Sequence, residues 1–348
     1  MPAPVDPKTP TESSPRHSPR IELPEEEGSP RTDGQTSPGL RNSKGWDGKL
    51  RVQRTAVLAN PEVLSDPESD DENVIPGEEL PADEGKQAHN AGSSIHRRPL
   101  PLASTLEDLD FYDNLISHIR GLDDLINLTS LDLSFNKIKH IKRVNHLTKL
   151  KELFLVANKI GTIENLEGLD NLTSLELGSN RIRVLQNLDS LKNLEELWVA
   201  KNKITELTGL GGLSNLRLLS IQSNRIRDLA PLADVPSLEE LYISHNALTS
   251  LAGIERNEKL RVVDISNNAV ASVKGLAPLK NLEELWASYN QIADFNEVEK
   301  ELRDKEKLTT VYFEGNPLQL RGPAVYRNKV RLALPQLSQI DATYVKTS

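Results

Sequence analysis

The chain has 348 residues, a formal net charge of −9 and no cysteine. Without cysteine, it can form neither a disulfide framework nor a thiolate zinc or iron–sulfur site, and this composition suits a reducing compartment. The acidic balance argues against general nucleic-acid binding, and no run approaches the roughly 18 apolar residues of a membrane span. The polar, proline-rich start does not resemble a signal peptide. We therefore expect no nucleic-acid or membrane partner, and a location in the nucleus and also in the cytoplasm.

Residues 1–104 are predicted to be a disordered tail, because they hold 15 of the 21 prolines and too few apolar residues to offset the entropy of ordering. Between Thr55 and Glu84 the tail carries ten acidic residues and no Lys or Arg. Regulation by phosphorylation and a merely solvating tail are both open interpretations. The candidate phosphorylation sites are Ser14, Ser18, Ser29 and Ser37 in Ser-Pro pairs, and Ser65 and Ser69 in the acidic stretch.

From Leu106 onward the chain repeats the unit Leu-x-x-Leu-x-Leu-x-x-Asn-x-Ile with a period of 22 residues. A tenth asparagine, Asn316, follows the ninth after 26 residues, so the last interval carries an insertion near residues 299–305. This periodicity predicts a leucine-rich-repeat solenoid of ten units over residues 105–320. The asparagines at the fixed register are Asn114, Asn136, Asn158, Asn180, Asn202, Asn224, Asn246, Asn268 and Asn290.

Each repeat predicts one short strand, and the stacked strands form a parallel sheet on the concave side, which makes the fold an α/β solenoid. Leucines at alternate strand positions point into the core, and the residue between them points outward. The asparagines should form a ladder that satisfies backbone groups at the turn after each strand. Because 22 residues leave too little chain for a full helix, we expect short 3₁₀ or extended turns on the convex side.

Residues 321–348 are predicted to cap the solenoid with a helix that ends before Pro335, since Tyr326, Val330 and Ala333 share one helical face. The other end has no comparable signal. Residues 85–104 match neither a repeat nor a helix pattern, so nothing in the sequence indicates what covers the first repeat.

Two columns of outward positions run along the predicted sheet. Nine of their twenty residues are acidic and none is basic, and five places in one column hold large aromatics, although aromatics make up only 4% of the chain. Ordinary strand residues that stabilise a sheet through cross-strand contacts are the alternative. An aligned stripe of aromatics and acids favours a protein-binding surface, and its partner should present basic and apolar groups. Lys201 and His245 are the main cationic exceptions near this surface.

The order of repeat variants resembles a known family. The matching strings include Leu131-Asp132-Leu133-Ser134-Phe135-Asn136, Leu175-Glu176-Leu177-Gly178-Ser179-Asn180 and, near the end, Ile340-Asp341-Ala342-Thr343. Over residues 106–345 the chain is similar to the leucine-rich-repeat regulatory subunits of protein phosphatase 1. The resemblance implies a non-catalytic, monomeric subunit that binds the phosphatase catalytic subunit with its concave face. It also implies control of the activity, maturation or location of that enzyme, and an association with a further inhibitor subunit.

Matching motifs carry the family's partner-binding residues onto this chain. Trp198 stands where relatives usually have Phe, a change that keeps an aromatic side chain. The family has at least one more repeat before the equivalent of Leu106, which this chain lacks. The implied partner-binding residues are Asp132, Phe154, Glu176, Trp198, Asp264, Glu284, Trp286 and Tyr312.

An enzyme is the first alternative. The histidines fall at unrelated repeat positions, and the sequence shows neither a nucleophile–base arrangement nor a glycine-rich phosphate loop, so we predict no catalytic residue, no metal and no cofactor. The second alternative is another intracellular scaffold of the same repeat class, such as a splicing or cytoskeletal adaptor. The acidic and aromatic order of the outward columns disfavours it.

Overall fold

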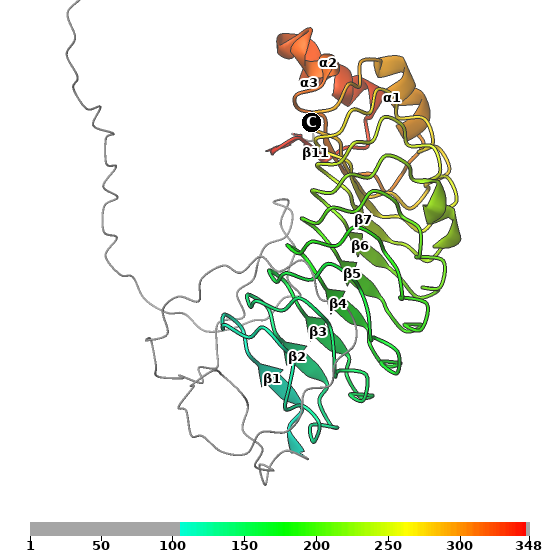
Figure 1. The fold of residues 1–348 in the computed structure, drawn as a ribbon. Coiled ribbons are helices and arrows are strands. Elements are labelled where there is room, and N and C mark those ends of the chain that lie inside the picture. Colours follow the sequence, from blue (N-terminus) through cyan, green and yellow to red (C-terminus); the bar gives the residue numbers. More distant parts are fainter. Residues whose placement is uncertain (1–104, 346–348) are drawn as a thin grey trace, which may run out of the picture. The chain divides into compact units, whose positions relative to one another are not determined.

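A computed structural model describes residues 105–345 and shows one twelve-stranded sheet whose strands follow one another in chain order (Figure 1). Each of the first ten strands has three residues and comes from one repeat. The strands are β1 (Asp108–Asp110), β2 (Ser130–Asp132), β3 (Glu152–Phe154), β4 (Ser174–Glu176), β5 (Glu196–Trp198), β6 (Leu218–Ser220), β7 (Glu240–Tyr242), β8 (Val262–Asp264), β9 (Glu284–Trp286), β10 (Thr310–Tyr312), β11 (Gln339–Ile340) and β12 (Thr343–Tyr344).

The pairing from β1 to β11 is parallel, and equivalent residues of successive repeats lie opposite each other. Leu131, for example, pairs with Leu109 on one side and with Leu153 on the other. This in-register stacking confirms the predicted parallel sheet. Only the last pair, β11 with β12, is antiparallel, so the described sheet ends in a small hairpin.

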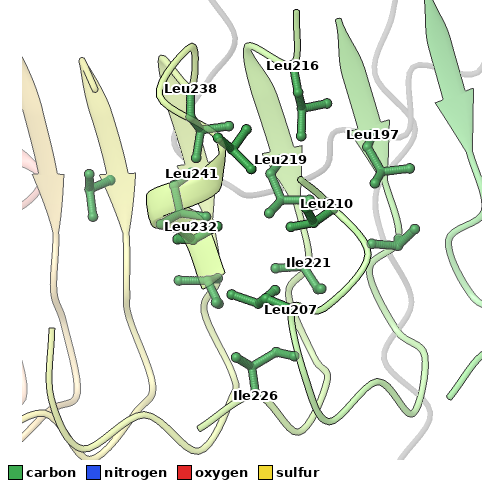
Figure 2. Close-up of a cluster of buried hydrophobic side chains, with 14 of the residues drawn as sticks. Leu197, Leu207, Leu210, Leu216, Leu219, Ile221, Ile226, Leu232, Leu238 and Leu241 are labelled. Carbon is green, nitrogen blue, oxygen red and sulfur yellow. The ribbon is translucent and has the colours of Figure 1, made fainter. Parts of the chain in front are cut away.

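The core is a single aliphatic stack between the sheet and the turns behind it (Figure 2). Leu197, Leu219 and Leu241 come from neighbouring strands and are fully buried, and Leu210 and Leu232 face them from the opposite side of the stack. Fully burying a leucine stabilises a fold by roughly 1.5–3 kcal/mol. Because every repeat supplies equivalent leucines, each unit gains its core only by stacking on its neighbours.

The predicted asparagine ladder is present, and Asn158 shows how it works. Its Oδ1 accepts a hydrogen bond from the backbone N of Ile138 in the preceding repeat at 2.9 Å, and its Nδ2 donates to the carbonyl of Leu133 at 3.0 Å. The same amide also donates to Leu155 O within its own repeat. One buried side chain therefore satisfies backbone groups of two repeats at the turn where the chain leaves the sheet.

The side opposite the sheet is built mostly of short turns, as predicted. One of these turns is the 3₁₀ helix η2 (Ala230–Asp234). The 26-residue repeat differs, because its extra residues allow a true helix, α1 (Phe295–Leu302), on the side of the stack opposite the strands (Figure 1). Asp294 caps this helix by accepting from the backbone N of Asn296 at 2.8 Å.

The predicted C-terminal cap is a small helical unit. It contains α2 (Pro317–Leu320) and α3 (Pro323–Ala333), and α3 packs against α1 and α2. As expected, α3 buries Tyr326, Val330 and Ala333. The hydroxyl of Tyr326 donates to the carboxylate of Asp341 at 3.0 Å, and that carboxylate accepts from the backbone N of Phe313 at 2.9 Å. Asp341 thereby joins the cap to the tenth repeat.

At the other end, β1 is the first described strand, and Leu106, Leu109 and Phe111 are only partly buried against the core. The tail 1–104 and the residues 85–104 discussed above lie outside the described residues, as do all six candidate phosphorylation sites. The domain boundaries at 104 and 320 stay predictions. Within residues 105–345, no helix is long and apolar enough to cross a membrane.

Candidate protein-binding face

The outward side chains of the sheet form one continuous surface. In each three-residue strand from β1 to β10 the middle residue points into the core, so the first and last residues lie on the other face. On β6 these residues, Leu218 and Ser220, are themselves buried. We call these twenty side chains the aromatic–acid face. Nine are carboxylates and none is Lys or Arg, which gives the face a one-sided negative charge.

Successive strands of the aromatic–acid face alternate in size over two repeats. The strands β3, β5, β7 and β9 each read Glu-Leu-aromatic, whereas β2, β4, β6 and β8 end in a smaller Asp, Glu or Ser. A large ring therefore has small neighbours on the adjacent strands, except that Trp286 has Tyr312 beside it on β10, and the small neighbours leave room for the ring to tilt. The aromatic residues of these four strands are Phe154, Trp198, Tyr242 and Trp286.

The rings are closest together at the C-terminal half of the face. The ring centroids of Tyr242 and Trp286 lie 5.9 Å apart, and those of Trp286 and Tyr312 lie 6.1 Å apart in an edge-on arrangement. Such geometries are favourable for aromatic pairs. With only 9% of its surface exposed, Trp286 is the most enclosed ring of the three.

The glutamates of the face hold these rings in place. Glu284 accepts a hydrogen bond from Trp286 Nε1 at 2.9 Å, and Glu240 accepts from the hydroxyl of Tyr242 at 2.8 Å. On β5, the indole of Trp198 donates to the glutamate two residues before it at 3.2 Å. Each carboxylate thus fixes the aromatic side chain on its own strand. Rings fixed before binding lose less conformational entropy when a partner arrives.

The burial of Asp264 differs from what the sequence predicts. We expected an outward acid in open contact with a partner, but only 4% of this residue is exposed. Its Oδ1 accepts from the backbone N of Ser266 at 2.9 Å. Burial raises the pKa of the Asp264 carboxyl, and the hydrogen bonds from Ser266 and Ser244 oppose that rise. Asp264 therefore lies beneath the surface of the face rather than at its front.

The other predicted residues all lie on the face, but in two groups. Asp132, Phe154 and Glu176 are half-buried on the consecutive strands β2, β3 and β4, and Asp132 accepts from the backbone N of Ser134. Trp286, Glu284 and Tyr312 belong to the C-terminal cluster, and Trp198 on β5 stands between the two groups. Their role in binding stays a prediction.

Gln339 is a part of this surface that the sequence analysis missed. Its Nε2 donates to the hydroxyl of Tyr312 at 2.7 Å, so the cap strand β11 supports the last aromatic of the face. The strand has only two residues and lacks the repeat pattern, so no sequence signal predicts it. Tyr242 and Glu240 occupy positions in the two outward columns but are not among the implied binding residues. The Glu-Leu-aromatic triplet that recurs every 44 residues would have selected both.

Within residues 105–345, no group of three or more His, Cys, Asp or Glu side chains could hold a metal ion. The carboxylates of the face are spread along the sheet, at most two to a strand, and the rings beside them donate hydrogen bonds to them or pack on one another. This arrangement offers charge and shape for recognition.

Three leucine-rich-repeat family models match the described region. The model "Leucine-rich repeat" matches residues 142–255, "Leucine Rich repeats (2 copies)" matches 258–304, and "Leucine Rich repeat" matches 125–139. The chain is a leucine-rich-repeat protein. Among solved structures, this leucine-rich-repeat chain resembles a leucine-rich-repeat protein of Leptospira interrogans, with a TM-score of 0.61 and 29% identity over 68% of this chain and 60% of that one. Internalin C2 of Listeria monocytogenes gives a TM-score of 0.50 and 32% identity over 52% of this chain and 80% of that one.

Curated relatives match shorter stretches at higher identity. The protein named "Protein phosphatase 1 regulatory subunit SDS22" of Schizosaccharomyces pombe is 71% identical over 55 residues, 16% of this chain and 17% of that protein. "Protein phosphatase 1 regulatory subunit 7" of Homo sapiens is 56% identical over 46 residues, 13% of this chain and 12% of that protein. These matches therefore span less than a fifth of either relative. The names describe regulatory subunits, in agreement with the prediction that this leucine-rich-repeat protein is not an enzyme.

Proposed function

We propose that this chain is a non-catalytic regulatory subunit that binds the catalytic subunit of protein phosphatase 1 with its aromatic–acid face. Two findings support the proposal. Relatives that are 56–71% identical over short stretches are named regulatory subunits of this phosphatase. The observation that carries it is the face itself, where Tyr242, Trp286 and Tyr312 form a fixed aromatic cluster on a surface of nine carboxylates that has no Lys or Arg.

The geometry favours a large, rigid protein partner over a small ligand. The face runs across ten strands, which at about 4.8 Å between strands extends for roughly 40 Å. Aromatic side chains in the middle of such a surface are the residues that dominate interface energetics. The surrounding carboxylates select a partner with basic groups and speed its approach, and salt weakens that effect.

The remaining parts of the proposal concern consequences of binding. A rigid repeat surface can hold the catalytic subunit in one conformation or cover part of it, and so control its activity, maturation or location. A further inhibitor subunit in the same assembly, a monomeric repeat chain and a nuclear as well as cytoplasmic location belong to this proposal by family resemblance. Each is a prediction for this chain.

Binding of the purified full-length chain to purified phosphatase catalytic subunit tests the proposal. We would measure the affinity by calorimetry with metal-depleted and with metal-loaded phosphatase. Binding that weakens when the phosphatase is metal-loaded supports a role in holding the immature enzyme, and equal binding supports a role in localisation. Absence of binding in both states, from a chain whose circular dichroism shows a folded repeat domain, would overturn the proposal.

A further inference from the structure

A second charged surface runs along the repeats, separate from the aromatic–acid face. The residue directly after the ladder asparagine is a cation in five consecutive repeats and is neutral in the three that follow, where it is Ala247, Ala269 and Gln291. We call the five cations the basic column. It consists of Lys137, Lys159, Arg181, Lys203 and Arg225.

The backbone holds the basic column in a strict register. Each cation follows a ladder asparagine and precedes a fully buried isoleucine, as Lys159 lies between Asn158 and Ile160. The backbone N of Lys159 donates to Ile138 O at 2.9 Å, and the backbone N of Arg181 donates to Ile160 O at 2.8 Å. The same bond recurs at the other three positions. Equivalent backbone atoms are therefore spaced like the strands of a parallel sheet, about 5 Å apart.

The side chains of the basic column are available to a partner. Four are exposed and Lys203 is half-exposed. None takes part in an ion pair within the described residues, whereas Arg217 and Arg261 on other parts of the repeats each form a two-bonded pair with a glutamate. Lys139, Arg183 and Arg227, two residues further along, add exposed cations beside the column.

Five cations whose backbone atoms are about 5 Å apart repel one another, so the folded chain holds them near each other at a cost that an anionic partner removes. We propose that the basic column is a docking site for an extended acidic segment of a partner polypeptide. Such a segment places side chains on one face every second residue, about 6.7 Å apart, which long Lys and Arg side chains can match. The proposal does not depend on the phosphatase, since the column lies outside the aromatic–acid face.

The surroundings of the column favour a polypeptide over a nucleic acid. Surfaces that bind single-stranded nucleic acid combine cations with aromatic side chains on which bases stack. Near the basic column, exposed aromatic side chains lie at its N-terminal end, where Phe135 contacts Tyr112. Two residues before each of the other four cations, the position equivalent to Phe135 is not aromatic and holds Ala157, Ser179, Lys201 or Ser223. The chain as a whole is acidic, which further weakens binding of a polyanion as long as a nucleic acid.

Fluorescence anisotropy of the full-length chain tests this site. The probe is a labelled peptide of about ten residues that alternates Glu and Ser, long enough to extend along the column. A Gln-Ser peptide of the same length and a single-stranded oligothymidine serve as comparison probes. We expect the Glu-Ser peptide to bind, the Gln-Ser peptide not to bind, and the affinity to fall as NaCl rises from about 50 to about 300 mM.

Two matched triple variants locate the binding. Combining Lys159→Gln, Arg181→Gln and Lys203→Gln should weaken binding of the Glu-Ser peptide by about fivefold or more, since each lost exposed contact has a modest effect. The control combines Arg256→Gln, Lys259→Gln and Lys274→Gln, which remove the same charge from exposed positions elsewhere and should leave the affinity unchanged. A peptide that does not bind, an equal loss in the control, or tighter binding of oligothymidine would overturn the proposal. If the variant with Lys159, Arg181 and Lys203 replaced also lost binding to the phosphatase, the basic column would not be a site separate from the aromatic–acid face, and the proposal would be overturned.

Discussion

Tyr242 and Trp286 lie on strands that are not neighbours, yet their ring centroids are only 5.9 Å apart. Strands two positions apart are separated by about 9.6 Å, so both rings tilt toward each other across β8. The residue of β8 at this position is Asp264, which is 4% exposed. The tilt of the two rings therefore brings them together into one aromatic surface. The same tilt encloses Asp264 beneath that surface.

Removing the central ring should weaken binding and also loosen the face. We expect Trp286→Ala to reduce affinity for the phosphatase catalytic subunit by about 2–4 kcal/mol, because the ring is an interface anchor in contact with two others. The variant should also unfold more easily, since truncating an enclosed aromatic leaves a gap. Calorimetric titration measures the first effect and urea denaturation the second.

Two further variants separate the loss of contact from the loss of structure. Trp286→Phe keeps one ring but loses the hydrogen bond to Glu284 and part of the packing surface of the indole, so it should bind with an intermediate affinity. Leu332→Ala removes an apolar side chain that is 75% exposed on α3, outside the face, and should bind as the unaltered chain does. Full affinity in Trp286→Ala would contradict the assignment of the ring as an anchor.

Asp264 should make stability depend on pH in a specific direction. Burial raises the pKa of this carboxyl above its ordinary value of 3.8, so between 3.8 and the raised value the folded chain binds more protons than the unfolded chain. The contribution of Asp264 to stability therefore decreases as pH rises through this window. Asp264→Asn keeps an oxygen for the backbone N of Ser266 and removes the buried charge.

We expect Asp264→Asn to raise the melting temperature at pH 7 by up to about 3 °C, and the difference to disappear toward pH 4. Thermal denaturation of both proteins across this range is the measurement. Asp110→Asn, at the equivalent and exposed position of β1, is the control and should change the melting temperature little at either pH. A variant that melts lower than the unaltered chain at pH 7 would show that the charged form of Asp264 is stabilising.

Position along the solenoid should decide the effect of losing a ladder asparagine. Asn180 Nδ2 donates to Leu155 O at 2.8 Å and Leu177 O at 3.0 Å, and its Oδ1 accepts from Ile160 N. Asn180→Ala leaves these buried groups without partners, and we expect a loss of about 3 kcal/mol or more in the free energy of unfolding. Urea denaturation provides the value.

The first repeat supplies the matched comparison. Asn114 is half-buried, and its Nδ2 donates only over short range, to Phe111 O and Tyr112 O at 3.1 Å. Because water can reach these groups, Asn114→Ala should cost about 1 kcal/mol or less. Equal losses for the two variants would argue against a ladder whose strength comes from burial.

Features that repeat were predictable from the sequence, and features that break the repeat were not. The strands, the asparagine ladder and the face of α3 follow from spacing, because stacking repeats the same contacts. The burial of Asp264 depends on rings from other strands, and the support of Tyr312 by Gln339 depends on how the cap folds back. Neither relationship leaves a periodic signal, so only the three-dimensional arrangement shows it.

Lys305 is the clearest example of a residue that breaks the repeat pattern. It occupies the turn position where a neighbouring repeat has Leu279, and its side chain is fully buried. Its Nζ donates to Ala277 O at 2.9 Å, while the Asp304 carboxylate is no closer than 4.0 Å. Burial lowers the pKa of Lys305 below its ordinary value of 10.5, and the nearby Asp304 opposes this.

Replacing Lys305 should therefore stabilise the fold at neutral pH. Below pH 10.5 and above the lowered value, the unfolded chain binds more protons than the folded one, so the stability of the unaltered chain should rise with pH in this window. Lys305→Met fills the same space without a charge, and we expect it to raise the free energy of unfolding at pH 7 by about 1 kcal/mol and to remove this rise. Urea midpoints from pH 7 to pH 10 test both effects. Lys307→Met, at an exposed site bonded to Asn281, should leave the midpoints nearly unchanged. A lower midpoint for Lys305→Met would mean that the hydrogen bond to Ala277 outweighs the cost of burying the ammonium group.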